Sequence, residues 1–214
     1  NFLAAKGGYN DESHNHNDAG TFSFWIDQTP FLIDAGVGTY TRQTFSKDRY
    51  TIWTMQSNYH NLPLINGVPQ KHGATYKATQ VQADKRKNTF TANIATAYPA
   101  EAEVESWIRS YSLQKGQLRI SDSFRLTTAK QPNQINFMTW GQVNTEIPGK
   151  IQLEVKGKKA FIEYDKQLFD VKTETIPLTD PRLSNVWGKS IYRITLTATN
   201  IYKTGNYSFI IKKQ

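Results

Sequence analysis

The sequence predicts an all-β protein, built as a large antiparallel β-sandwich with little or no helix. Aromatic residues make up 13% of the chain, and Thr, Val and Ile are frequent, which favours strands. Apolar and polar residues alternate with a period of two through most of the sequence. Gly, Pro, Asn or Lys-Gly turns separate the alternating runs, and no stretch has a convincing helical period.

The first strands lie in the N-terminal part of the chain. "NFLAAKGG" (1–8) has the pattern of a strand that enters a turn. "TFSFWID" (21–27) alternates Phe22, Phe24 and Ile26 with more polar positions. "PFLIDAG" (30–36) follows after about two turn residues, which predicts a β-hairpin.

The alternation continues to the C-terminus, which gives about ten strands in all. The later candidates are "TFTANIATAY" (89–98), "VESWIRSYSL" (104–113), "GQLRISDSFRL" (116–126), "QINFMTW" (134–140), "KIQLEVKG" (150–157), "KAFIEYD" (159–165), "SIYRITLTAT" (190–199) and "NYSFIIKK" (206–213). Their spacing is typical of a sandwich. "TTAKQPNQ" (127–134) is a loop and not a domain boundary, because the pattern resumes unchanged beyond it, so residues 1–214 are expected to form one domain.

Composition limits the possible functions. The chain has no cysteine, which excludes disulfides and a thiolate zinc site. Its formal net charge of +8 would attract polyanions, and charge alone allows nucleic acid, anionic lipid or acidic polysaccharide. No apolar run approaches the length of a membrane span, and no signal peptide is visible. Because "NFLAAKGG" already has the pattern of a strand, we expect the chain to be a piece of a longer protein.

The stretch "SHNHNDAG" (13–20) holds two of the four histidines. In an extended segment, side chains two apart share a face, so His14, His16 and Asp18 are expected to point the same way. Asp34, at the end of a very apolar strand, and His60, in "SNYHNLPLING" (57–67), are further candidate ligands for a metal such as zinc. A solvated polar turn is the alternative, and spacing alone favours it.

A cationic stretch follows the hairpin. Arg42, Lys47 and Arg49 lie in "TYTRQTFSKDRY" (39–50), and Arg42 and Arg49 are the candidate substrate-binding residues. Composition alone also fits an ordinary solvated loop. His72, beside Lys71, is expected to be an exposed loop residue.

These motifs together resemble the heparinase II/III-like family of polysaccharide lyases. The resemblance runs from "KGGYNDESHNHNDAGTFSFWIDQTPFLIDAGVGTY" (6–40) through "SNYHNLPLINGVPQ" (57–70) to "AYPAEAEVESWIRSYSL" (97–113), "LRISDSFRL" (118–126), "NFMTWG" (136–141) and "WGKSIYRITL" (187–196). The combination of H-N-H-N-D, D-A-G, Y-H-N and N-G-x-x-Q is fairly specific. The hairpin turn reads "DQTP" where the family usually has D-G, which puts the hairpin register in doubt.

The resemblance implies a fold, an activity and a set of site residues. Members pair an N-terminal α/α-toroid with a C-terminal β-sandwich, and this chain resembles the sandwich alone. The family's metal, usually zinc, would be held by His16, Asp34 and His60, and His14 would lie at the active-site cleft as the catalytic residue of this domain. The toroid carries the principal catalytic Tyr, so the isolated chain is expected to be inactive.

The family reaction is β-elimination at a uronic acid. The expected partners are therefore an acidic polysaccharide, such as heparin, heparan sulfate or alginate, and the toroid of the same protein, with no nucleic acid and no membrane. The expected location is periplasmic or secreted, in a bacterium. One alternative is a non-catalytic carbohydrate-binding or accessory module. A cupin-like metal enzyme is less favoured, because no Glu follows the HxH at the required spacing.

Overall fold

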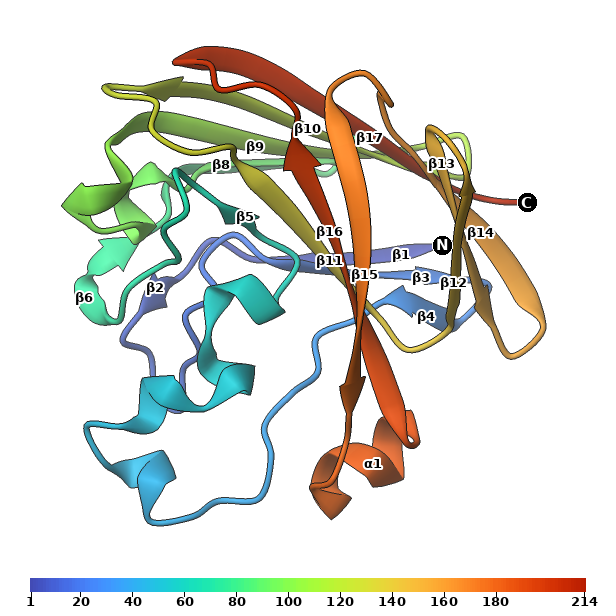
Figure 1. Cartoon of the computed structure of the whole chain (residues 1–214), viewed down its shortest axis with the longest axis horizontal. Helices are drawn as coiled ribbons and strands as arrows, with labels where there is room; N and C mark the ends of the chain where they lie inside the picture. The colour runs from blue at the N-terminus through green and yellow to red at the C-terminus, as the bar shows by residue number, and fades with distance from the viewer.

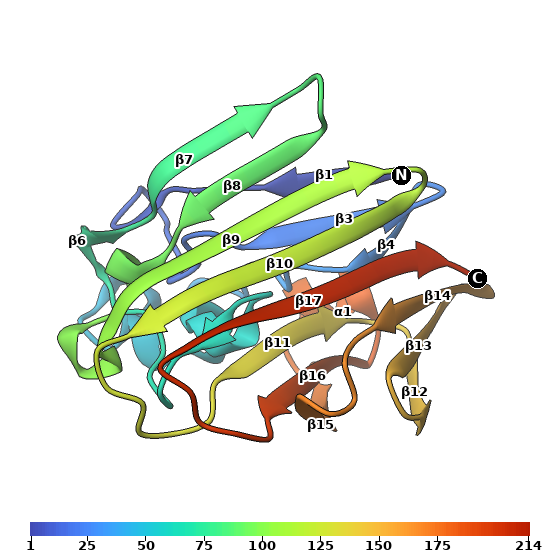
Figure 2. The same cartoon turned by 90° about the horizontal axis from the view of Figure 1, so that it is seen from above.

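The larger layer of the molecule is an eight-stranded antiparallel sheet, shown from above in Figure 2. It forms because every second side chain along the middle of its central strands is buried, and most of these side chains are apolar, such as Trp107 and Tyr111, or Ile120 and Phe124. The strand order is β12 (Gln142–Ile147), β13 (Lys150–Val155), β14 (Lys158–Glu163), β17 (Thr204–Lys213), β10 (Gln117–Leu126), β9 (Val104–Gln114), β8 (Thr89–Asn93) and β7 (Thr79–Asp84).

Two smaller sheets form the second layer of this computed structural model, which describes residues 1–214 (Figure 1). One has the order β1 (Phe2–Ala5), β3 (Phe22–Ile26) and β4 (Thr29–Leu32), and the other has β15 (Phe169–Pro177), β16 (Ser190–Ala198), β11 (Gln134–Thr139) and β5 (Pro63–Leu64). A backbone bond from Ile33 N to Met138 O, 2.9 Å long, joins them.

Aromatic side chains fill the space between the layers. The rings of Phe22 and Tyr111 lie 5.0 Å apart, and those of Phe137 and Phe209 lie 5.4 Å apart, so each pair links the second layer to the eight-stranded sheet. These residues belong to the main hydrophobic core. The predicted antiparallel β-sandwich is therefore confirmed.

The turn between β3 and β4 is a tight hairpin turn, although its sequence "DQTP" (27–30) contains no glycine. Asp27 and Gln28 both have left-handed backbone conformations, with φ of 48° and 63°. Two such residues in succession are typical of the type I′ turn, whose twist matches the flanking strands. Trp25 pairs with Pro30 and Ile26 with Thr29, so the two-residue hairpin predicted from the sequence is confirmed.

The strand count predicted from the sequence was too low. The prediction missed the edge strands β7, β12 and β15 and the short strands β2 (Tyr9–Asn10), β5 and β6 (Gly73–Lys77). The strand predicted over 89–98 ends at Asn93, and a 3-10 turn, η5 (Ala95–Ala97), follows, with η6 (Ala100–Ala102) soon after. The predicted loop after β10 is confirmed, since no strand occurs between Leu126 and Gln134.

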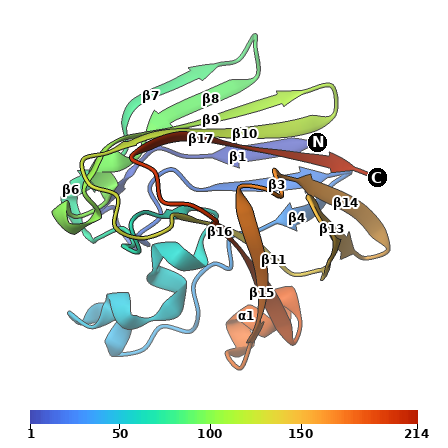
Figure 3. The ribbon, with the colours of Figure 1, turned by 45° about the horizontal axis from the view of Figure 1, so that its top comes forward.

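Helical structure is confined to short pieces. The single α-helix, α1 (Pro181–Trp187), begins where Asp180 accepts a bond from the backbone N–H of Arg182 and Pro181 occupies the first turn. No helix has the length and apolar character needed to cross a membrane. The segment after β4 contains four 3-10 turns, namely η1 (Gln43–Phe45), η2 (Arg49–Thr51), η3 (Trp53–Met55) and η4 (Ser57–Tyr59). Figure 3 shows these turns and α1 on the side of the molecule away from the eight-stranded sheet.

Candidate metal centre

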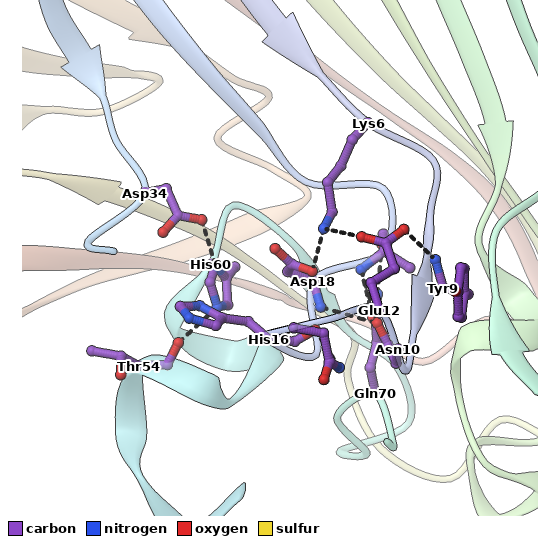
Figure 4. Close-up of polar contacts among 12 residues, drawn as sticks. Lys6, Tyr9, Asn10, Glu12, His16, Asp18, Asp34, Thr54, His60 and Gln70 are labelled. Atoms are coloured by element: carbon purple, nitrogen blue, oxygen red, sulfur yellow. Dashed lines mark hydrogen bonds and ion pairs between the residues drawn. The ribbon is translucent and has the colours of Figure 1, made fainter. Parts of the chain in front are cut away.

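Three side chains from separate segments of the sequence converge at one site (Figure 4). His16 comes from the loop after β2, Asp34 follows β4 by two residues, and His60 follows η4. One potential ligand atom from each lies within 4.8 Å of the other two. The fold therefore brings together the three residues that the family resemblance assigns to metal binding.

Hydrogen bonds fix the orientation of the His60 ring. Its Nε2 lies 3.0 Å from the carbonyl oxygen of Thr54, and its Nδ1 lies 2.9 Å from Asp34 Oδ2. A backbone carbonyl can only accept, so Nε2 carries a proton and Nδ1 faces the carboxylate. This arrangement, in which the outer ring nitrogen donates to a carbonyl, is the usual way that proteins orient a metal-binding imidazole.

The Asp34 carboxylate is held from its other side. The backbone N–H of Gly36 donates to Asp34 Oδ1 at 2.8 Å, which leaves Oδ2 for His60. The backbone of Gly36 is left-handed, with φ of 80°, a conformation that glycine adopts without strain. The D-A-G motif therefore turns the chain so that its own backbone N–H holds the carboxylate.

The charges of the three groups are unequal. Burial alone would lower the pKa of His60, but the adjacent Asp34 carboxylate outweighs burial and raises it. Burial alone would raise the pKa of Asp34, but His60 holds it well below its usual range. Burial and the neighbouring His60 lower the pKa of His16 to about 4, so this imidazole is neutral near pH 7.

The donor set suits a divalent cation. Two imidazole nitrogens and one carboxylate oxygen are ligands that zinc accepts, and three protein ligands leave a fourth tetrahedral position. His60 Nδ1 and Asp34 Oδ2 lie 2.9 Å apart, and a cation bound by both atoms would take the place of the hydrogen bond between them. His16 needs no deprotonation near pH 7. These three residues therefore fit a zinc ion or another divalent metal.

The loop that carries the histidines is a series of turns and not the extended segment expected from the sequence. His14 is exposed and has a left-handed backbone with φ of 57°, whereas His16 is partly buried beside His60. The prediction that His14, His16 and Asp18 share one face by strand alternation is therefore wrong. The Asp18 carboxylate instead pairs with Lys6 at 2.7 Å.

Buried amides from elsewhere in the chain set this loop geometry. Asn10 Oδ1 accepts from the backbone N–H groups of Asp18 and Ala19 at 3.2 and 3.3 Å. Gln70, the last residue of N-G-x-x-Q, accepts from Ala19 N at 3.0 Å and donates to Ala19 O at 2.8 Å. Because Asn10 and Gln70 satisfy the backbone of this stretch, it needs no strand partner. Sequence reasoning missed both residues, although N-G-x-x-Q signalled Gln70.

The two candidate substrate-binding arginines differ in their contacts. Arg49 donates to the backbone oxygen of Asn15 at 2.8 Å and to that of Thr44 at 2.9 Å, so it ties the histidine loop to the 3-10 turns. Arg42 is exposed at the start of η1. His72 is exposed, as expected, and stacks on Tyr50 with ring centroids 4.2 Å apart. Of these two arginines, Arg42 is therefore the more accessible to a ligand.

Comparison with known proteins identifies the family of this chain. The family described as "Heparinase II/III-like, C-terminal" matches residues 2–180. The chain therefore belongs to the heparinase II/III-like C-terminal family, and the resemblance seen in the sequence is confirmed.

Solved structures show the same fold. Heparan sulfate lyase HepC from Pedobacter heparinus matches with a TM-score of 0.73 and 16% identity, and a mutant of it matches with 0.74 and 17%. The heparinase III-BT4657 gene product matches with 0.72 and 14%. Each comparison covers 99% of this chain and 32% of the other, so this chain spans about a third of those proteins. No curated protein sequence matches.

Proposed function

We propose that this chain is the β-sandwich domain of a polysaccharide lyase, which cleaves a uronic-acid-containing acidic polysaccharide by β-elimination. The substrate would be a glycosaminoglycan such as heparin or heparan sulfate, or alginate. The domain would supply a divalent-metal site, with zinc as the proposed ion, and an active-site histidine. Membership of the family supports the proposal, and the convergence of His16, Asp34 and His60 within 4.8 Å carries it.

The metal residues would organise the histidine loop. A divalent ion held by His16, Asp34 and His60 would supply a fixed positive charge that links three segments of the chain. Thr54 orients His60, Gly36 orients Asp34, and Arg49 holds the loop backbone at Asn15. His14 stands two residues from His16 and is exposed, so a stable site would fix the position from which His14 meets a substrate.

His14 is the proposed catalytic residue of this domain. In β-elimination a base removes the proton at C5 of the uronate, the C–H electron pair forms the C4=C5 double bond, and the C4–O bond breaks. An acid then protonates the departing glycosidic oxygen. An imidazole near pH 7 can donate or accept a proton, and it can also neutralise charge that builds on the uronate carboxylate.

The remaining parts of the proposal concern partners and location. A net charge of +8 favours an acidic polysaccharide, and exposed Arg42 is a proposed contact for its anionic groups, with Arg49 as the second candidate. The solved relatives are about three times longer than this chain, which fits a second, toroidal domain carrying the other catalytic groups. We propose a periplasmic or secreted location, where such polysaccharides are met.

The test compares the protein that contains both domains with its His14→Ala variant on heparan sulfate, hyaluronan and alginate. Cleavage produces an unsaturated uronate, whose ultraviolet absorbance gives the rate. We expect cleavage of at least one polymer, a rate loss of about 10²-fold or more for His14→Ala, and no cleavage by the 214-residue chain alone. Polysaccharide binding without cleavage by the two-domain protein would instead establish a carbohydrate-binding module.

A further inference from the structure

Asn61 follows the candidate ligand His60 and is completely buried. Its Nδ2 donates to the backbone oxygen of Phe22 at 2.7 Å and to that of Ile33 at 3.1 Å. Its Oδ1 accepts from the backbone N–H of Met138 at 2.7 Å. One amide therefore ties the segment that carries His60 to strand β3, to strand β11 and to the residue just before Asp34.

A buried ion pair stands behind Asn61. Arg109 on β9 forms a two-pronged contact with Asp122 on β10, with Nε–Oδ1 and Nη2–Oδ2 distances of 2.8 Å each. The third guanidinium nitrogen, Nη1, donates to the backbone oxygen of Asn61 at 2.8 Å. Trp107 Nε1 adds a bond to Asp122 Oδ1 at 2.9 Å. The pair thus directs one charged donor at the backbone beside His60.

The location of this pair in the core needs an explanation. Arg109 and Asp122 are directly opposed in the strand register, and both side chains are 0% exposed. Taking two charges out of water costs several kcal/mol per ion, and well-packed apolar residues of similar volume are often as stable or more so. Net stability is therefore a weak explanation for the pair, and the contacts show a second consequence, a charged donor held at the backbone oxygen of Asn61.

We propose that Asn61, backed by Arg109 and Asp122, is a positioning residue for the metal centre. None of the three is a ligand. Asn61 sets the separation of His60 and Asp34 in two ways. It is the residue directly after His60, and its side chain binds the backbone oxygen of Ile33, the residue directly before Asp34. This inference rests on the proposed metal site, and it predicts that the network controls metal affinity as well as stability.

The test uses cobalt(II) as the only added metal, followed by competition with zinc, on the 214-residue chain. Visible absorption of cobalt reports both the affinity and the ligand geometry. The variant is Asn61→Ala, and the matched control is Asn66→Ala. Asn66 is also a buried asparagine, it donates to the backbone oxygens of Ala102 and Thr128 at 2.9 and 2.7 Å, and none of its hydrogen-bond partners is one of the three candidate ligands. Unfolding by urea is measured for each protein without metal.

We expect both variants to be less stable and only Asn61→Ala to bind cobalt more weakly, by about ten- to a hundredfold and with an altered spectrum. If Asn61→Ala does not fold, Asn61→Ser, whose hydroxyl is too short to reach all three backbone groups, replaces it with the same expectation. Equal affinity in wild type and the folded Asn61 variant would overturn the inference. The His60→Ala variant lacks a candidate ligand and is expected to bind no cobalt. A wild-type chain that also binds no cobalt would instead refute the proposed metal site.

Discussion

Two ion pairs of this molecule differ in burial and in hydrogen bonding. Arg109 and Asp122 form a closed pair, in which each guanidinium nitrogen already has an oxygen partner at 2.8 Å. Asp34 and His60 form an open pair, held at 2.9 Å by one contact beside a third potential ligand, His16. The Asp34 side chain is also 32% exposed, whereas both members of the closed pair are fully enclosed.

The hydrogen bonding of the two pairs differs in the same way as their burial. In the closed pair, hydrogen bonds satisfy the charges, so the arrangement is rigid and has no capacity for a further ligand. In the open pair, a single hydrogen bond joins the two side chains, a proposed cation would replace its proton, and His16 is neutral near pH 7 beside it. Asn61 lies between the two, since it accepts from Arg109 and adjoins His60.

The largest expected effect comes from breaking the closed pair. Arg109→Leu leaves the Asp122 charge buried without its cationic partner, and we expect a loss of about 3–5 kcal/mol in the free energy of unfolding. Replacing both residues, Arg109→Leu with Asp122→Leu, removes both charges and is expected to cost less than either single change. Urea unfolding of the three variants measures this. A double variant less stable than both single ones would show that the pair is not a closed unit.

The open pair is expected to gain stability from metal. Zinc at about a hundred times its dissociation constant would stabilise the folded chain by about 2.7 kcal/mol, because the ligands converge only in the folded state. His16→Ala removes one ligand and should abolish this gain. Thermal unfolding with and without zinc checks both proteins. His14→Ala is the matched control, because His14 is exposed and outside the ligand set, and it should keep the full gain.

The two histidines of the centre should respond differently to pH. The raised pKa of His60 means that this ring holds its proton to a higher pH than an ordinary histidine, and a metal must displace that proton. The lowered pKa of His16, about 4, means that this ring offers no competing proton in the same range. Metal affinity should therefore fall as pH falls, by about tenfold per unit between about pH 6.5 and pH 5, as for one proton.

Calorimetric titration in buffers of different ionisation enthalpy counts the protons released on binding. One proton near pH 6 supports the assignment. Two protons would mean that His16 is charged in the free protein, and none would mean that the Asp34–His60 contact does not compete with metal.

The smallest expected effect separates the two candidate substrate-binding arginines. Arg49→Ala removes bonds to the backbone oxygens of Asn15 and Thr44, so we expect a loss of about 1–2 kcal/mol in stability. Arg42→Ala should leave stability within about 0.5 kcal/mol, because the residue is exposed. Urea unfolding measures the stability of both variants. The polysaccharide affinity of the two-domain protein, measured for each variant, shows which of the two arginines contributes to binding. Equal losses of stability would contradict the roles assigned here.

The sequence predicted the strands that are buried on one face, and it missed those at the sheet edges. β9 and β10 alternate strongly because their inner side chains fill the core. β7 and β12 lie at the two edges of the eight-stranded sheet, and most of their residues are exposed, so little hydrophobic alternation marks them. Hydrophobic alternation therefore predicts a strand only where one face of that strand is buried.

The same reasoning applies to the site. His16, Asp34 and His60 were predicted through the family resemblance, and the fold brings them together. The shape of the histidine loop was predicted wrongly, because it depends on Gln70, a residue far along the chain. The closed pair did leave a signal in the sequence. Arg109 is in phase with Trp107 and Tyr111, and a charge in phase with core aromatics predicts a buried partner.

The measurement that tests the account most directly is the metal content of the wild-type chain and of its His16→Ala and His60→Ala variants, each dialysed against the same zinc buffer and shown to be folded. The three candidate ligand atoms lie within 4.8 Å of one another, so we expect about one zinc per wild-type chain and almost none in either variant. Full zinc content in a folded His60→Ala protein, or none in the wild type, would contradict it.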